Sequence, residues 1–171
     1  MKKLTILLLL VLVAIFFVSF VSLAEDKNPY IDFKQIKYFY YIETYVRGGN
    51  AQSLGIVQND LSKYVLSQFK KYFDKMQFPY QKRKIPINAL DSWKKEWGRL
   101  YVVIWPMGDK SPINYYITIK AGNGLTYFWE KIIFEEAQKE QILTDVKNNI
   151  DQIIQELATD FFKVREKRQT Q

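Results

Sequence analysis

Apolar residues recur at helical spacing in two segments of the chain. The first segment, Ser53–Met76, has its apolar stripe at Leu54, Val57, Leu61, Tyr64, Val65, Phe69, Tyr72, Phe73 and Met76. The second, Lys139–Lys167, has its stripe at Ile142, Val146, Ile150, Ile153, Leu157, Phe161 and Val164. One-sided stripes of this period predict two amphipathic helices that each cover an apolar surface. Gly55 favours a start of the first helix nearer Ile56.

Alternation of side-chain character predicts strands in four other segments. These are Gln35–Val46, Arg99–Met107, Ile113–Gly122 and Thr126–Phe134. The "NGL" stretch at Asn123–Leu125 is a strong hairpin signal between the last two strands. The predicted meander therefore runs through the second half of the chain, between the two helices.

Residues 77–98 give the weakest pattern. Pro79 and Pro86 are compatible with an edge strand or with an extended link. The following "DSWKKEWG" predicts a short helical turn, with Asp91 as its N-cap and Gly98 at its end.

This order of elements predicts an α+β fold. We expect a two-layer sandwich, in which an antiparallel sheet of about four strands carries both helices on one face, in the order β-α-(β)-β-β-β-α. The purely aliphatic strand positions should face the helices, and they are Leu100, Val102, Ile104, Ile117 and Ile119.

The opposite sheet face is rich in aromatic residues. Its candidate partner-binding residues are Phe39, Tyr41, Tyr101, Trp105 and Tyr116. Tyrosine and tryptophan are common both in strands and on recognition surfaces. Two interpretations therefore stay open: a partner binds this face, or the segment around Trp93 and Trp97 folds over it.

The N-terminus has the three parts of a secretory signal. Lys2 and Lys3 precede an apolar run, Leu4–Val21, and "SLA" at Ser22–Ala24 precedes two acidic residues. We expect a signal peptide over residues 1–24, a single α+β domain over 25–164, a basic tail over 165–171, and a periplasmic location. The alternative is an uncleaved anchor through residues 4–21, because that run approaches the length that spans a bilayer.

Composition narrows the possible chemistry. The chain has no histidine and no cysteine, which removes the commonest metal ligand and general base and all thiol chemistry. The net charge is +7, or +5 without Lys2 and Lys3, which is mildly basic. We expect no catalytic, cofactor-binding or metal-binding residues and no cofactor.

Three weaker site patterns have simpler explanations. Ser67 and Lys71 stand one helical turn apart, as on an exposed helix face, and the basic run 82–84 is typical of a solvated loop. Four acidic residues, Glu130, Glu135, Glu136 and Glu140, lie around a strand-to-helix junction, where they favour a helix start.

The order of several short motifs resembles a group of bacterial exported proteins of unknown function. The motifs are "GIVQNDL" at 55–61, "GRLYVVI" at 98–104, "YYITIK" at 115–120, Trp129 and "ATDFFKV" at 158–164. The resemblance spans most of residues 35–164 and implies no activity. The order of elements is also similar to small envelope adaptor and lipoprotein accessory domains, although this chain has no cysteine for lipid attachment.

The sequence therefore predicts a non-enzymatic accessory or binding protein of the cell envelope. An envelope protein, a lipid headgroup or a glycan would be its partner, and no nucleic acid is expected for an exported chain. The alternatives are a membrane-anchored structural protein and a hydrolase that works without histidine or cysteine. The oligomeric state stays open.

Overall fold

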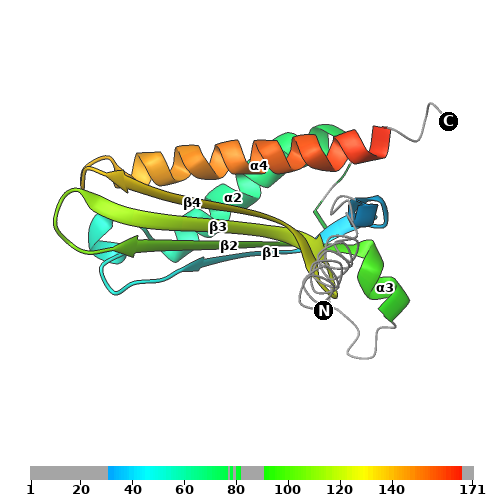
Figure 1. Ribbon diagram of the computed structural model, residues 1–171, viewed down its shortest axis with the longest axis horizontal. Coiled ribbons are helices and arrows are strands. Elements are labelled where there is room, and N and C mark those ends of the chain that lie inside the picture. Colours follow the sequence, from blue (N-terminus) through cyan, green and yellow to red (C-terminus); the bar gives the residue numbers. More distant parts are fainter. Residues whose placement is uncertain (1–30, 77, 79, 82–90, 167–171) are drawn as a thin grey trace, which may run out of the picture.

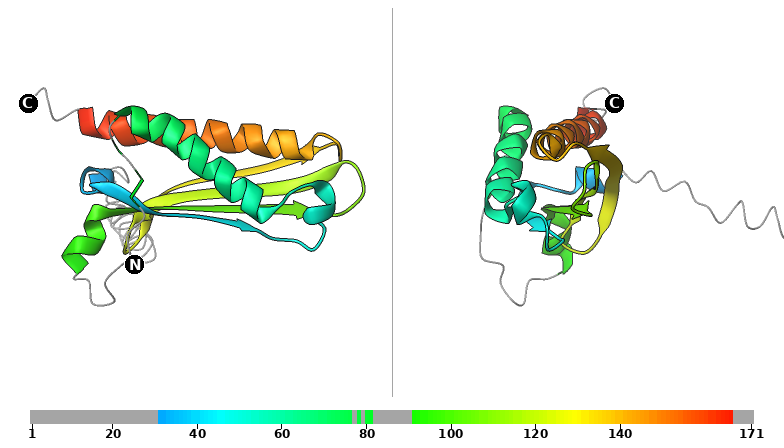
Figure 2. Two further views of the ribbon diagram at one scale, coloured as in Figure 1. Left: turned by 180° about the vertical axis from the view of Figure 1, so that it is seen from behind. Right: turned by 90° about the vertical axis from the view of Figure 1, so that its left-hand side faces the viewer.

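The computed structural model describes residues 31–76, 78, 80–81 and 91–166. The expected signal peptide or anchor, the basic run 82–84 and residues 167–171 lie outside this range. Within it, the chain forms one sheet with two long helices on one face, together with short helical segments (Figures 1 and 2). The predicted α+β two-layer architecture is confirmed.

The sheet has the strand order β1-β2-β3-β4. Its strands are β1 (Tyr38–Val46), β2 (Trp97–Met107), β3 (Ile113–Asn123) and β4 (Tyr127–Ala137). The pairs β2–β3 and β3–β4 are antiparallel, as the meander predicts. The β1–β2 pair is parallel, so the sheet is mixed and the expectation of an all-antiparallel sheet is wrong for β1. The reason is the long crossover through α2, which brings the chain back to the end where β1 began.

Both predicted amphipathic helices pack against the sheet. Helix α2 (Gln58–Phe73) is extended by the short 3-10 segments η2 (Gln52–Leu54) and η3 (Asp74–Met76), and Gly55 interrupts the N-terminal extension with a φ of 74°. Helix α4 runs over Ile142–Glu166 and lies beside α2 (Figure 2). Among the described residues, no helix has both the length and the apolar character needed to cross a bilayer.

The core lies between this helix layer and the sheet. It contains the aliphatic strand positions expected to face the helices, Leu100, Val102, Ile104, Ile117 and Ile119. At one end it becomes aromatic, because Phe39 contacts Phe69 and Phe73 of α2 and Phe161 of α4 edge-on or at a tilt, with ring centroids 4.9–5.6 Å apart.

The last turn of α4 closes this aromatic end. Arg165 Nη1 donates to the carbonyls of Phe33 and Ile36, at 2.9 and 2.7 Å. Its guanidinium also lies over the rings of Phe78 and Phe161. Arg165 is therefore part of the folded domain, and the expected tail from residue 165 is wrong for this residue. Arg165 is held in the domain because the backbone carbonyls of Phe33 and Ile36 accept hydrogen bonds from its guanidinium.

The short helix α3 (Asp91–Glu96) confirms the predicted helical turn but ends before Gly98. Residues Trp97 and Gly98 instead begin β2, opposite Tyr38 and Phe39. The expectation that Gly98 ends the helix is therefore wrong, because this glycine pairs within the sheet. The β3–β4 hairpin is as predicted: Asn123 Oδ1 accepts the backbone N–H groups of Leu125 and Thr126.

Candidate functional site

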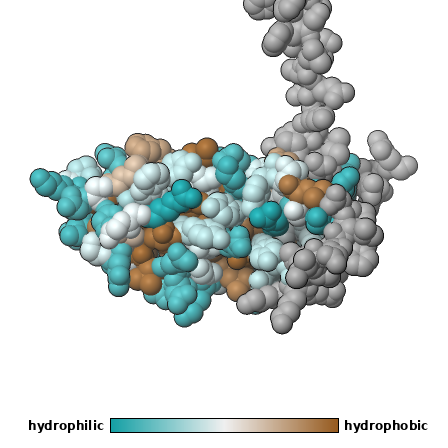
Figure 3. All heavy atoms as spheres, turned by 90° about the horizontal axis from the view of Figure 1, so that it is seen from below, coloured by the Kyte–Doolittle hydropathy of each residue, from teal (hydrophilic) through white to brown (hydrophobic). Residues whose placement is uncertain are grey.

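The sheet surface turned away from α2 and α4 is here called the open face (Figures 1 and 3). Its members follow from the strand register, because alternate residues point to opposite sides of a sheet. They include Tyr41, Glu43, Tyr45, Arg99, Tyr101, Val103, Trp105, Tyr116, Thr118, Lys120, Tyr127, Glu130, Ile132, Phe134 and Glu136. Figure 3 looks onto this face and shows hydrophobic side chains between polar ones.

Two rows of apolar side chains cross the open face side by side. In the first row, Trp105 of β2 and Phe134 of β4 flank Tyr116 of β3. In the second, Val103 and Ile132 flank Thr118, whose side chain they help to bury. Trp105, Ile132 and Phe134 are 44%, 52% and 63% exposed, which is high for large apolar residues. Both ends of the first row and the Ile132 end of the second are therefore available for contact, whereas Val103 is buried.

Tyrosines continue this surface toward β1. The rings of Tyr45 and Tyr101 lie 5.1 Å apart, and Tyr101 is 6.1 Å from Tyr127. The Arg99 guanidinium lies over the Tyr127 ring, 5.0 Å from its centroid. Burial raises the pKa of Tyr127, while the Arg99 charge acts in the opposite direction. This part of the face is thus a packed layer of aromatic rings.

A bulge in β1 decides which of its aromatic residues reach the open face. Phe39 pairs with Gly98 and Tyr41 with Arg99, so Tyr40 is an extra residue in the strand. Phe39 consequently points into the core, where it is fully buried. The prediction that Phe39 belongs to the partner-binding face is wrong, because strict alternation does not hold across the bulge. Tyr40 turns to the open side instead, with its ring 4.8 Å from that of Tyr41.

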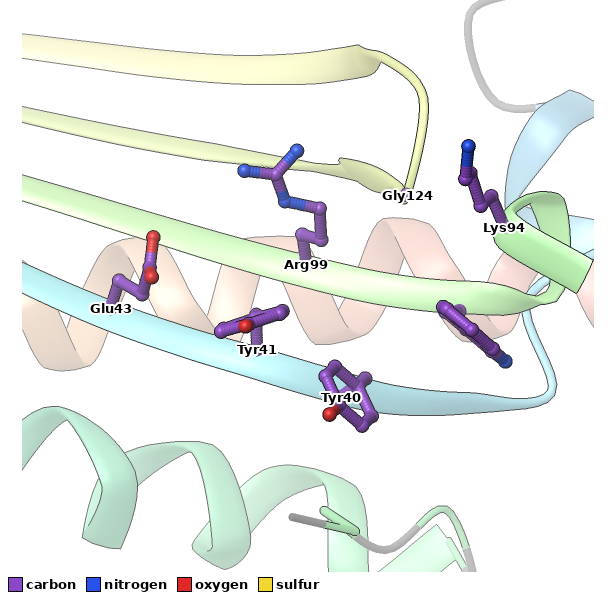
Figure 4. A pocket seen from close by; sticks show the side chains of 7 residues that line it. Tyr40, Tyr41, Glu43, Lys94, Arg99 and Gly124 are labelled. Atoms are coloured by element: carbon purple, nitrogen blue, oxygen red, sulfur yellow. The ribbon is translucent and has the colours of Figure 1, made fainter. Parts of the chain in front are cut away.

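A cavity of about 310 Å³ lies at the α3 end of the open face (Figure 4). Its lining residues are Tyr40, Tyr41, Glu43, Lys94, Trp97, Arg99 and Gly124. Tyr40 and Trp97 are buried and stacked, with ring centroids 5.6 Å apart. Glu43, Tyr41 and Arg99 project from neighbouring strands, and Lys94 approaches from α3. This cavity is thus partly aromatic and carries three charged side chains.

The structure brings four of the five predicted site residues onto one face. Tyr41, Tyr101, Trp105 and Tyr116 share the open face, and Phe39 does not. Sequence reasoning missed Tyr40, Trp97, Arg99, Ile132 and Phe134. The sequence did contain a signal for the last two, since Ile132 and Phe134 alternate with Ile133 along β4.

Residues considered for catalysis have structural partners. Ser67 Oγ donates to the Tyr64 carbonyl, whereas Lys71 Nζ lies 2.9 Å from Asp151 Oδ1. Glu130 forms an ion pair with Lys120 at 2.9 Å and, through this hydrogen bond, raises the pKa of Lys120. No group of three or more acidic residues suited to a metal ion occurs in the part of the chain that the structure describes.

The comparisons with known proteins add no relative to this description. No family model, no curated protein and no solved structure matches the chain. Function must therefore be argued from the open face and its cavity.

Proposed function

We propose that this protein is a non-enzymatic binding component of the bacterial cell envelope, exported to the periplasm, which holds a partner protein on its open face. The secretory pattern of residues 1–24 supports export. The observation that carries the binding role is the pair of apolar rows, which end in Trp105, Ile132 and Phe134.

The exposed side chains favour a protein partner. Contiguous exposed apolar surface marks interaction sites, and the centres of protein interfaces are enriched in aromatic residues. Ile132 and Phe134 have no polar group with which to contact a glycan hydroxyl. They also lie on β4, an edge strand of the sheet within the described residues, whose outer backbone groups can pair with another chain.

The charges on this side of the sheet argue against lipid headgroups. Anionic lipids attract clusters of lysine and arginine. The strands here present a mixture of both signs instead, from Glu43, Arg99, Lys120, Glu130 and Glu136. Lys120 is moreover already paired with Glu130. A partner protein with an apolar centre and a mixed polar rim is the better complement.

Photo-crosslinking in living cells tests the proposal. A photoreactive amino acid placed at Phe134 should give a discrete adduct with one envelope protein. The same group at Lys63, an exposed residue of α2, should not. Mass spectrometry identifies the adduct, and it also reads the mature N-terminus, which we expect at Glu25.

Binding of the purified partner then provides the quantitative test. Trp105→Ala should weaken binding about tenfold or more, since a buried tryptophan at an interface centre commonly dominates affinity. Lys63→Ala should leave it unchanged. Equal adducts from both positions, or unchanged affinity for Trp105→Ala in a folded protein, would contradict the proposal.

A further inference from the structure

The cavity at the α3 end of the open face has a fixed wall. Gly124, in the β3–β4 hairpin, donates its backbone N–H to the Lys94 carbonyl of α3 at 2.7 Å. A Cβ atom at Gly124 would lie 2.8 Å from that carbonyl oxygen, so the hairpin and the helix meet as closely as backbones allow. The buried Tyr40–Trp97 stack forms another part of the lining. The cavity is therefore held between packed elements.

Arg99 is the distinctive charged group in this cavity. Its guanidinium lies over the Tyr127 ring, and among the described residues it has no hydrogen bond or ion pair. Guanidinium N–H groups form a planar fork that matches a carboxylate. Figure 4 shows the Arg99 side chain running from β2 across the sheet toward β4, in the same general direction as the side chains of Glu43 and Lys94. A ligand acceptor in the cavity would give the Arg99 donors a partner that the described residues do not provide.

The other lining groups restrict the ligand further. Tyr41 is 38% exposed and lies beside the buried Tyr40, so its ring offers a flat surface for stacking. Glu43 is acceptor-only when ionised and suits hydroxyl or amide donors. The Glu43 carboxylate in the same lining repels a second negative charge, so the cavity matches a monoanion better than a doubly charged phosphate.

We propose that this cavity binds an acidic sugar: a ring that stacks on Tyr41, with its carboxylate on Arg99 and its hydroxyls on Glu43. The volume of about 310 Å³ lies at the lower end of the range for small-molecule sites and accommodates one or two sugar rings. This site is separate from the apolar rows around Trp105, and it does not rest on the proposed protein partner.

Titration of the purified protein with glucuronate, followed by protein NMR and by tryptophan fluorescence, tests the inference. We expect saturable binding of glucuronate and much weaker binding of its neutral methyl ester. Arg99→Gln should weaken glucuronate binding about tenfold or more, because hydrogen bonds to charged groups are the strong ones. Glu43→Gln should weaken both glucuronate and the ester.

The matched control is Lys120→Gln, which removes one positive charge from the same face outside the cavity. It should leave affinity unchanged. If Arg99→Gln does not fold, Arg99→Lys keeps the charge but loses the fork and should still weaken binding. No saturable glucuronate binding, equal binding of the ester, or equal losses for Arg99→Gln and Lys120→Gln would overturn the inference, whatever the fate of the protein partner.

Discussion

At the scale of single residues, Gly98 shows how closely the chain is fitted around the bulge in β1. A Cβ atom at this position would lie 2.8 Å from the Phe39 ring and 3.0 Å from Ile36 Cγ2. Both neighbours are fully buried, so neither can move into solvent. Because Gly98 has no side chain, the Phe39 ring has space to point into the core.

Gly98→Ala should therefore destabilise the protein. We expect the free energy of unfolding to fall by about 1–3 kcal/mol, the usual cost of overpacking a filled core. Urea denaturation followed by circular dichroism measures this change. Gly49→Ala is the control, since no atom lies within 4 Å of a Cβ there. Equal stability of the two variants would show that the space beside Phe39 is not filled as described.

At the scale of elements, the bulge in β1 determines which sheet face each of four consecutive aromatic residues reaches. These residues are Tyr38, Phe39, Tyr40 and Tyr41. Phe39 alone enters the core cluster. Tyr40 stacks on Trp97 and Tyr38 packs beside them, while Tyr41 stays partly exposed. Because of this extra residue, Phe39 can contact the core while Tyr40 lines the cavity.

Alanine substitutions on either side of the bulge should separate these roles. Phe39→Ala should cost about 3–5 kcal/mol of unfolding free energy, as for other buried phenylalanines. Tyr41→Ala should cost about 1 kcal/mol or less, because its ring is partly solvated already. Thermal and urea unfolding of both variants provide the comparison. Similar costs for the two would mean that β1 follows strict alternation.

The bulge also marks a limit of sequence reasoning. Stripes at helical spacing predicted α2 and α4, and aliphatic alternation correctly assigned the helix-facing side of β2 and β3. The "YFYY" stretch at 38–41 carries no such signal, because four aromatic residues in a row look the same in either phase. Alternation identifies a strand's faces but not its neighbour, and so the parallel partner of β1 could not be predicted.

The cavity was harder to predict than the open face. Its residues come from β1, β2, the β3–β4 hairpin and α3, and no single motif contains them all. The pattern around Trp97 predicts a helical turn, whereas Trp97 is the first residue of β2. A site assembled by register between distant segments has no local pattern for a single sequence to show.

At the scale of the whole molecule, tyrosine burial links stability to alkaline pH. Tyr115 is 2% exposed, and its hydroxyl accepts a hydrogen bond from Asn149 Nδ2 at 2.7 Å. Burial raises its pKa to about 12. Burial likewise raises the pKa of Tyr64, Tyr80 and Tyr127. These phenols lose their protons more readily in the unfolded chain, where the ordinary tyrosine pKa is about 10.

The contribution of these tyrosines to the free energy of unfolding should therefore be fully present below about pH 10 and should decline as pH rises toward 12. Tyr115 alone accounts for a slope of up to about 1.4 kcal/mol per pH unit in that window. Urea midpoints at a series of pH values test this, with tyrosinate absorbance recorded in parallel. The decline should be shallower in Tyr115→Phe. An unchanged slope in that variant would assign the alkaline loss to other groups.

The parallel pairing of β1 with β2 suggests the order in which the strands pair during folding. Strands β2, β3 and β4 are joined by short connections and can find one another soon after the chain begins to collapse. β1 meets β2 only after the whole crossover through α2 and α3 has been drawn in, which costs more loop-closure entropy. We expect the meander to form first and β1 to dock late. The tyrosines of β1 would then be the last to reach their neighbours. The cavity at the α3 end of the open face would be the last part of the surface to form.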